Sequence, residues 1–348
     1  MKLNKKTLAA LAVTALLSGT AMAETSFTIY GRANVSVEQQ KVGSQSDSVM
    51  VDNASRLGFR ANRDLSDGMS VGTVLEAGTN LTSGSTKNKL FAREASVALN
   101  GAFGQVKLGR MPASVAYFAT ADYVSNHNHD TGTSSDALYD FLATGSLSNA
   151  VGYASPKLGA LKLEAQYGLK KSTGAGTNDS AVVNPVAAAA SYDAGALQLG
   201  LGYESAQNPV LAASNPTTTS TASQVTARAF YTMGPLGFGG YVQKSSGTNF
   251  ARNAYRLSAM YTLGQNEFHV NVGAAGNRAG AANTGASQYT LGYNYNLDKQ
   301  TKVYALYTKI NQDSATNAYQ ANSSGFVSGS TANGLSLNSV GAGVRYNF

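Results

Sequence analysis

The sequence predicts an all-β fold, a 16-stranded antiparallel β-barrel that spans a membrane. Three observations lead to this prediction: a secretory leader, a composition poor in charge but rich in glycine and aromatic residues, and segments in which apolar and polar residues alternate. Lipid-facing residues of a membrane barrel occupy every second position, so no long apolar run marks a strand.

Residues 1–23 have the features of a secretory signal peptide. Three lysines in MKLNKK precede the short apolar run TLAALAVTALLSGT, and AMA is a small-x-small cleavage signal. The apolar run is shorter than the roughly 20 residues that a spanning helix needs. We expect cleavage near Ala23 and a transmembrane barrel domain of residues 24–348. Loss of the three lysines lowers the formal net charge from +7 to +4.

The composition excludes an ordinary soluble domain and a disulfide-held secreted fold. The chain has 37 glycines, 19 tyrosines, 12 phenylalanines and no cysteine. Charged residues make up 13% of the chain, against about 25% in a typical soluble domain. No stretch after the leader is long and apolar enough for a transmembrane helix. A membrane barrel fits these properties.

Four segments show the period of two that is typical of strands: FTIYGRANVSVE, ALKLEAQYGLKK, EFHVNVGA and SQYTLGYNYNL. In the first, Phe27 and Ile29 share a face that is opposite to Tyr30 and Arg32. Alternation alone also fits a soluble sandwich, in which the apolar face points inward. The leader, the glycine content and the low charge favour a lipid-facing apolar surface and a wet interior.

Short turns and long polar segments alternate along the chain, and their number sets the number of strands. Seven short turns alternate with eight long segments, so fifteen connections join sixteen strands. Short turns on one side and long loops on the other are typical of outer-membrane barrels, and sixteen strands leave an aqueous lumen. The short turns are 64–68, 100–104, 156–159, 193–195, 233–236, 263–266 and 297–300, and the long segments are 40–49, 80–87, 112–146, 171–184, 206–221, 245–250, 277–284 and 311–333.

Several motifs resemble the trimeric general porins of Gram-negative bacteria, and the likeness runs the full mature length. The most specific is ASRLGFRANRDLSDGMSVGTVLE, residues 54–76, which is similar to the second hairpin of that family. The final VGAGVRYNF ends in Phe348, which resembles the signal read by the barrel-assembly machinery. The other matching segments are FTIYGRANVSVE, GAFGQVKLGR and NAVGYASPKLGALKLEAQYG.

The resemblance implies a homotrimer in the outer membrane, in contact with lipid and lipopolysaccharide. It implies a water-filled channel for passive diffusion of small hydrophilic solutes and ions, without cofactor, metal, nucleic acid or catalytic residues. It also implies a third loop that folds into the barrel, where acidic residues face a cluster of basic residues on the wall.

The third long segment, 112–146, contains VSNHNHD, with two of the three histidines of the chain. We interpret it as a polar loop at the pore constriction. A metal site needs at least three ligands in fixed geometry, and an enzyme needs a nucleophile with its base; neither set is evident. The candidate residues of the constriction loop are Asp122, His127, His129, Asp130, Asp136 and Asp140.

Arg32, Arg56 and Arg60 occupy the alternate positions that carry polar residues in their strands, so we expect them on the pore wall. An arginine facing lipid at mid-depth costs roughly 2–4 kcal/mol; the alternative is a solvated position at the rim. Strict alternation puts Arg93 on the apolar face, whereas the resemblance puts it on the wall. Ser146 stands near a position where the family commonly has arginine, so we expect only a mild preference for anions.

Two other functions fit the same barrel. A substrate-specific channel would use an aromatic track, for which Tyr30, Tyr241 and Tyr304 are candidates on distant strands. A surface adhesin or receptor would use the external loops, whose neutral Ser/Thr/Asn-rich sequences carry no binding signature.

Overall fold

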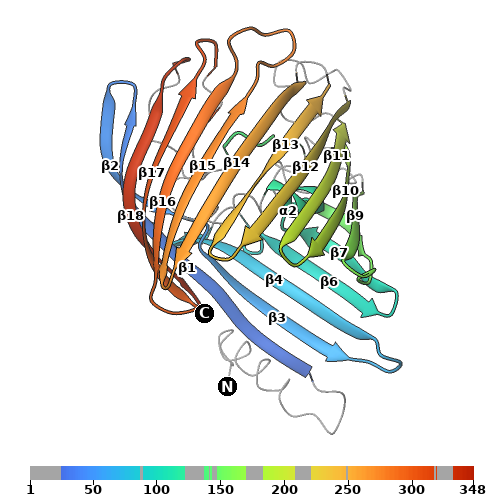
Figure 1. Ribbon diagram of the computed structural model, residues 1–348. Coiled ribbons are helices and arrows are strands. Elements are labelled where there is room, and N and C mark those ends of the chain that lie inside the picture. Colours follow the sequence, from blue (N-terminus) through green and yellow to red (C-terminus); the bar gives the residue numbers. More distant parts are fainter. Residues whose placement is uncertain are drawn as a thin grey trace, which may run out of the picture.

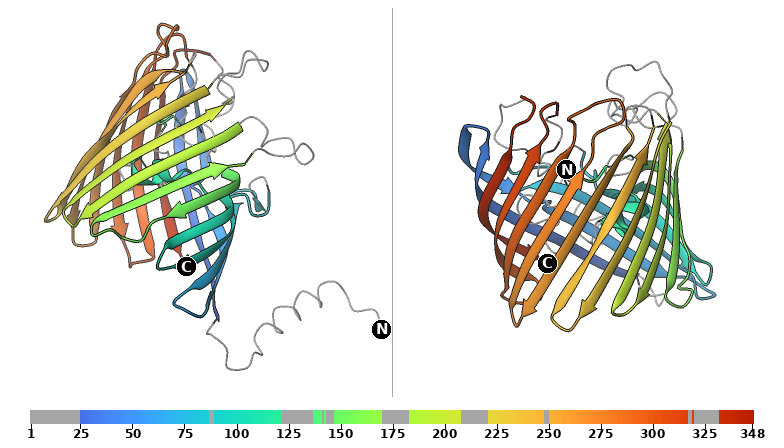
Figure 2. Two further views of the ribbon diagram at one scale, coloured as in Figure 1. Left: turned by 90° about the vertical axis from the view of Figure 1, so that its right-hand side faces the viewer. Right: turned by 45° about the horizontal axis from the view of Figure 1, so that its top comes forward.

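The structure is a computed structural model that describes residues 25–86, 89–121, 137–140, 142, 147–169, 183–207, 221–247, 250–316, 319 and 332–348. The expected signal peptide lies outside these residues. The described strands form one closed antiparallel barrel (Figures 1 and 2). The strands are β1 (Thr25–Val42), β2 (Gln45–Asp52), β3 (Arg56–Asp64), β4 (Ser70–Asn80), β5 (Ser85–Thr86), β6 (Glu94–Gly101), β7 (Gly104–Met111), β8 (Leu147–Ala154), β9 (Leu161–Gly168), β10 (Val183–Ala194), β11 (Leu197–Gln207), β12 (Thr221–Met233), β13 (Leu236–Ser246), β14 (Arg252–Leu263), β15 (Asn266–Ala275), β16 (Ala286–Asn296), β17 (Thr301–Gln312) and β18 (Leu337–Asn347).

The eighteen strand segments make sixteen barrel strands. The strands β2 and β3 both pair with β1 and are two parts of one barrel strand. Likewise, β5 and β6 both pair with β4. The predicted all-β class and the predicted number of strands are therefore confirmed. The described part of the chain contains no helix that is long and apolar enough to cross a membrane.

The barrel closes where β1 pairs with β18, from Arg32 opposite Asn347 to Val42 opposite Leu337. The C-terminal residue extends this seam by one step. Gly31 N donates to the Phe348 carbonyl at 2.9 Å, and Phe348 N donates to the Gly31 carbonyl at 3.1 Å. The Phe348 ring lies so close to Gly31 that a Cβ there would overlap it. Closure leaves no unpaired edge in the lipid.

The predicted turn at 297–300 is held by a side-chain cap. Asp298 Oδ1 accepts hydrogen bonds from the backbone N of Gln300 at 2.7 Å and of Thr301 at 2.6 Å. These bonds stabilise the charged carboxylate and hold the pKa of Asp298 below its ordinary value. Several other turns at this end contain a glycine with positive φ, for example Gly195 at +74° and Gly264 at +58°.

The prediction of a long loop at 40–49 is wrong. Strand β1 continues to Val42 and β2 begins at Gln45, so the connection is a tight turn at Gly43, whose φ is +59°. The hairpin of β1 and β2 stands beside β18 (Figure 1), with which β1 stays paired up to Val42. Its polar residues pair with one another: Gln39 Nε2 donates to Ser46 Oγ at 2.8 Å. A polar segment that resembles a loop in sequence is thus part of two paired strands.

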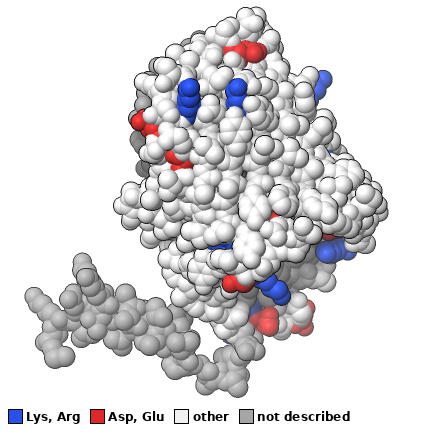
Figure 3. Space-filling view, turned by 60° about the vertical axis from the view of Figure 1, so that its left-hand side comes forward, with Lys and Arg blue, Asp and Glu red and all other residues white. Residues whose placement is uncertain are grey.

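The two faces of the strands differ as alternation predicts. On β11, Leu199, Leu201 and Tyr203 are exposed on the outside, whereas Gly202 and Glu204 are buried on the inside. The outer surface over β1, β17 and β18 is free of charge across most of its middle, with charged side chains towards its two ends (Figure 3). The outside therefore has the apolar band that lipid requires.

Deletion of Phe348 should lower the yield of assembled barrel, because it removes the last two backbone hydrogen bonds of the seam and the ring over Gly31. Heat-modifiable gel migration of outer-membrane fractions measures the yield. Molecules that do assemble should keep the wild-type conductance. Phe103→Ala, an aromatic residue at a short turn away from the seam, is the matched control. Equal yields of the deletion and the wild type would contradict the prediction.

Candidate functional site

The third long segment folds into the barrel, as the described residues at its two ends show. After β7 the chain forms the short helix α2 (Val115–Ala119), whose N-cap Ser114 accepts a hydrogen bond from Ala116 N at 3.1 Å. The helix packs on the inner wall of β9, β10 and β11. Gln166 Oε1, on β9, accepts a hydrogen bond from Val115 N at 3.1 Å.

Small residues on the wall let this helix lie directly on the sheet. A Cβ at Gly202 would come within 2.8 Å of Ala116 Cβ, and one at Gly200 would overlap the Ala119 carbonyl. Ala187, on the neighbouring strand, is fully buried under the same helix. A larger inward side chain at these positions would push the helix into the lumen.

Three tyrosines join the returning part of the loop to the wall. Tyr139 makes edge-on contacts with Tyr117, at 5.2 Å between ring centroids, and with Tyr241 of β13, at 5.8 Å. All three rings are buried. Tyr241, a candidate for an aromatic track, therefore packs against the loop.

Asp140 attaches the loop to the wall and is itself almost fully buried. Its carboxylate accepts from Arg252 Nη2 at 2.5 Å and Nε at 2.7 Å, from Arg278 Nη2 at 2.8 Å, and from Ser245 Oγ at 2.8 Å. Gln243 clamps the Asp140 backbone: its Oε1 accepts from Asp140 N at 2.9 Å and its Nε2 donates to Asp140 O at 3.2 Å. Asp140 belongs to the predicted constriction loop, but these partners occupy its carboxylate. The other predicted loop residues, Asp122, His127, His129, Asp130 and Asp136, lie outside the described residues, as does Ser146.

Basic residues gather on the inner wall on both sides of the seam. Arg32 of β1 is directly opposite Arg56 of β3, and Lys302 of β17 is opposite Arg345 of β18. Arg32 Nε donates to Asn347 Oδ1 at 2.9 Å, and Arg56 Nε donates to the Ala54 carbonyl at 3.1 Å. Lys302 Nζ lies 3.6 Å from Glu267.

A second inner-wall cluster connects β1, β3 and β4. The guanidinium of Arg60 lies over the Tyr30 ring, 4.8 Å from its centroid. The Tyr30 hydroxyl donates to Glu76 Oε2 at 2.9 Å, and Arg93 Nε donates to Glu76 Oε1 at 2.5 Å. Strict alternation fails for Arg93 because β6 begins only at Glu94. Its contact with Glu76 places it beside the inward-facing Tyr30.

The helix α2 of the loop lies on the opposite side of the barrel from Arg32 and Arg56 of the basic wall. In the ring of sixteen strands, β1 and β11 are eight places apart. The helix α2 covers β9 to β11, while Arg32 and Arg56 lie on β1 and β3. The returning end of the loop reaches further round, since Leu138 belongs to a buried cluster with Val42, Ile310 and Leu337.

Sequence reasoning missed the wall partners of the loop. Arg252 and Gln243 are buried and inward-facing, but nothing in the local sequence connects them to Asp140, more than 100 residues away. Arg345 could have been found, since it alternates with the outward Val344 and Tyr346 in VRYNF. No group of three or more potential metal ligands occurs in the described part of the chain.

Comparison with known proteins gives a consistent result. A family model described as Gram-negative porin matches residues 7–317. Outer membrane porin protein 32 of Delftia acidovorans is 28% identical over 365 residues, which cover 99% of this chain and 100% of that protein. The solved anion-selective porin from Comamonas acidovorans has a TM-score of 0.78 at 23% identity, over 93% of this chain and 100% of that one. In-vitro folded OmpT of Vibrio cholerae, in its trimer form, has a TM-score of 0.64 at 16% identity, over 93% and 99%.

Asp140→Asn should loosen the loop, because it leaves Arg252 and Arg278 without their shared carboxylate in a buried site. Breaking a buried ion pair typically costs about 3–5 kcal/mol. Single-channel recordings should show more frequent transient changes of conductance, and the loop should be cleaved faster by added protease. Asp193→Asn, at a short turn, removes the same charge away from the loop and should behave like wild type. If Asp140→Asn shows the wild-type frequency of conductance changes and the wild-type rate of loop cleavage, these contacts do not hold the loop.

Proposed function

The chain belongs to the Gram-negative porin family, and from this premise we propose that it is a general diffusion porin with a mild preference for anions. It forms a water-filled channel across the outer membrane, through which small hydrophilic solutes and ions diffuse passively. The described residues of the loop and the basic wall are proposed to bound the narrowest part of this channel.

The observation that supports the anion preference is the pairing of arginines on the inner wall. Arg32 and Arg56 are directly opposite on neighbouring strands, an arrangement in which like charges repel. Mobile anions in a wet lumen relieve this repulsion. A low-dielectric barrel wall focuses the field of such a cluster into the channel, so the cluster selects ions by sign. The preference is mild because Glu76, Glu94 and Glu267 lie on the same inner wall.

The comparisons support the same proposal. The Comamonas porin of the same fold is described as anion-selective, and the relatives that match this chain are porins, not enzymes. We propose no catalytic role for the histidines or acids of the loop. Their expected position at the constriction stays a prediction.

The aromatic-track alternative finds little support in the candidate tyrosines. Tyr30 donates its hydroxyl to Glu76, and Tyr304 donates to Asn34 Oδ1 at 2.9 Å. Tyr304 is almost fully buried, and Tyr241 packs against the loop. These rings are occupied by contacts within the protein. No described feature of the external loops favours an adhesin or a receptor.

Replacement of Arg56 and Arg60 by serine should move the reversal potential in a salt gradient towards that of a cation-preferring channel. The ratio of anion to cation permeability should fall roughly twofold or more, because two positive charges leave the wall. The control Lys157→Ser/Lys299→Ser removes two exposed positive charges at the short turns and should leave the ratio near its wild-type value. An unchanged ratio and conductance in the arginine variant would place these side chains outside the conducting path.

We further propose that the mature protein is a heat-resistant homotrimer. Outward alanine and glycine residues permit close packing between subunits, and the Vibrio cholerae relative of the same fold has a trimer form. Unheated samples should migrate as trimers on detergent gels and convert to monomers on boiling, and light scattering should give three chains per particle. Monomer mass in both measurements would contradict the proposal.

A further inference from the structure

The inner wall of β3, β4, β6 and β7 contains a polar recess of about 260 Å³. Its floor is made by two small residues that are directly opposite each other, Gly72 of β4 and Ala98 of β6. A Cβ at Gly72 would overlap Asn62 Oδ1, so the glycine keeps the floor open. The recess lies on the lumen side of the sheet, between Glu76 and the short turns.

Two basic side chains border the recess from opposite sides. Arg60 belongs to β3, and Lys107 belongs to β7, where it is directly opposite Ala98 of the floor. These two strands are three strand spacings apart in the sheet, which is about 14 Å. The long side chains of Arg60 and Lys107 therefore reach towards each other over the floor, and the space between them fits a small solute.

The guanidinium of Arg60 is available to a solute. Arg60 is exposed inside the barrel, and its guanidinium lies over the Tyr30 ring, 4.8 Å from the ring centroid. It makes no hydrogen bond to another residue in the part of the chain that the structure describes. A guanidinium offers two parallel N–H donors to a carboxylate, so Arg60 is suited to bind one.

The carboxylate of Glu94 has one occupied oxygen and one open oxygen. Glu94 Oε1 accepts from Lys107 Nζ at 3.0 Å and from Ser96 Oγ at 2.6 Å. Glu94 Oε2 accepts no hydrogen bond from the described residues, and Lys107 keeps further N–H donors beyond the one that Glu94 uses. The recess thus presents an open acceptor with negative charge beside two donors with positive charge.

The charges around the recess indicate the solute that fits. Arg60 and Lys107 are cations and Glu94 is an anion. A solute that matches all three carries two carboxylates and one ammonium group, which is the charge pattern of an acidic amino acid. A volume of 260 Å³ corresponds to about nine waters, or a solute of about nine non-hydrogen atoms, which is the size of aspartate.

Other solutes of this size match the recess less well. A dicarboxylate without an amine would bring negative charge towards Glu94 without a counter-charge. A neutral amino acid or a sugar would leave one of the two cations without a carboxylate. The pattern of two cations and one anion therefore separates acidic amino acids from both neighbouring classes.

We propose that this recess is a binding site for acidic amino acids on their way through the channel. One carboxylate binds Arg60, the second binds Lys107, and the ammonium group donates to Glu94 Oε2. The site rests on the proposed function, because a solute reaches it only through an aqueous lumen. Glu94, which weakens the general preference for anions, here selects among anions.

The solute class is tested with aspartate, with succinate, which lacks the ammonium group, and with asparagine, which lacks the second carboxylate. Each is titrated onto the channel in a planar bilayer at constant pH and ionic strength, and the fall in chloride conductance gives a half-saturating concentration. Aspartate should lower the conductance with saturation, because it occupies the lumen and neutralises the wall. Succinate and asparagine should need about fivefold higher concentrations or more, since each lacks one charge-assisted contact. Equal half-saturation by aspartate and succinate, or no saturation by aspartate, would overturn the proposal.

The recess itself is tested by filling its floor without a change of charge. Ala98→Leu covers the floor, and Ala165→Leu makes the same change on the outward face of β9. Ala98→Leu should raise the half-saturating concentration of aspartate about fivefold or more and keep the wild-type ratio of chloride to potassium permeability, whereas Ala165→Leu should match wild type in both. Unchanged aspartate binding in Ala98→Leu would overturn the recess. The proposed ion preference is judged separately, by the permeability ratio of the wild type.

The role of Glu94 is tested by Glu94→Gln against Glu267→Gln, which removes the same charge from the inner wall of β15. Glu94→Gln should abolish the preference for aspartate over succinate, because the ammonium group loses its acceptor. Glu267→Gln should retain that preference. Equal behaviour of the two variants would mean that the wall holds anions by its general charge, which overturns the assignment to the recess.

Discussion

The structure depends on one constraint: a backbone inside a membrane must find all of its hydrogen-bond partners within the protein. The strands meet it by closing into a ring, and the seam of β1 and β18 completes that ring down to Phe348. The third loop meets the same constraint inside the barrel by a different route. Two wall glutamines bond to its backbone at both described ends, Gln166 at Val115 and Gln243 at Asp140. The wall therefore surrounds the loop and also supplies hydrogen-bond partners for its backbone.

Charged side chains of the lumen form two sets, one at the contact between the loop and the wall and one on the wall opposite α2. Where the loop contacts the wall, the buried carboxylate of Asp140 is paired with Arg252 and Arg278. Across the barrel, Arg32 and Arg56 have neutral acceptors in Asn347 and the Ala54 carbonyl. The first set of charges holds the loop in position, and the second set lies on the wall opposite α2. Substitution of Asp140 therefore tests the attachment of the loop, and substitution of Arg56 with Arg60 tests the proposed ion preference.

The period of two, together with the leader, the glycine content and the low charge, predicted the barrel. The alternation of short turns and long segments predicted its strand number, and the period of two predicted the inward position of Arg32, because lipid imposes the same rule on every strand. The predictions were wrong or incomplete where the alternation of polar and apolar residues gives no guidance. The segment 40–49 is polar and resembles a loop, but its residues up to Val42 and from Gln45 belong to the paired strands β1 and β2. Arg93 precedes β6, so its contact with Glu76 follows the path of the chain and not the alternation. The bond between Asp140 and Arg252 joins residues 112 positions apart, and no local pattern carries such information.

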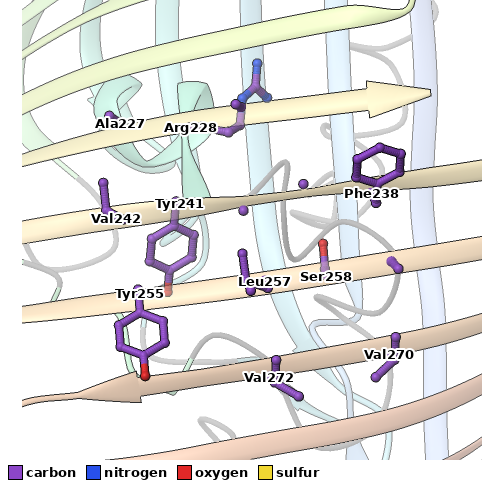
Figure 4. A pocket seen from close by; sticks show the side chains of 14 residues that line it. Ala227, Arg228, Phe238, Tyr241, Val242, Tyr255, Leu257, Ser258, Val270 and Val272 are labelled. Atoms are coloured by element: carbon purple, nitrogen blue, oxygen red, sulfur yellow. The ribbon is translucent and has the colours of Figure 1, made fainter. Parts of the chain in front are cut away.

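Strand β13 shows how one segment meets the demands of both faces. Its inward residues Tyr241, Gln243 and Ser245 contact the loop through a ring, an amide and a hydroxyl. Its outward residues Gly240 and Val242 line an apolar hollow in the outer surface over β12 to β15 (Figure 4). Because the two sets alternate, a one-residue slip in register would remove both at once. The pairing of β13 with β12 and β14 therefore sets both the contacts of the loop on the inner face and the apolar surface on the outer face.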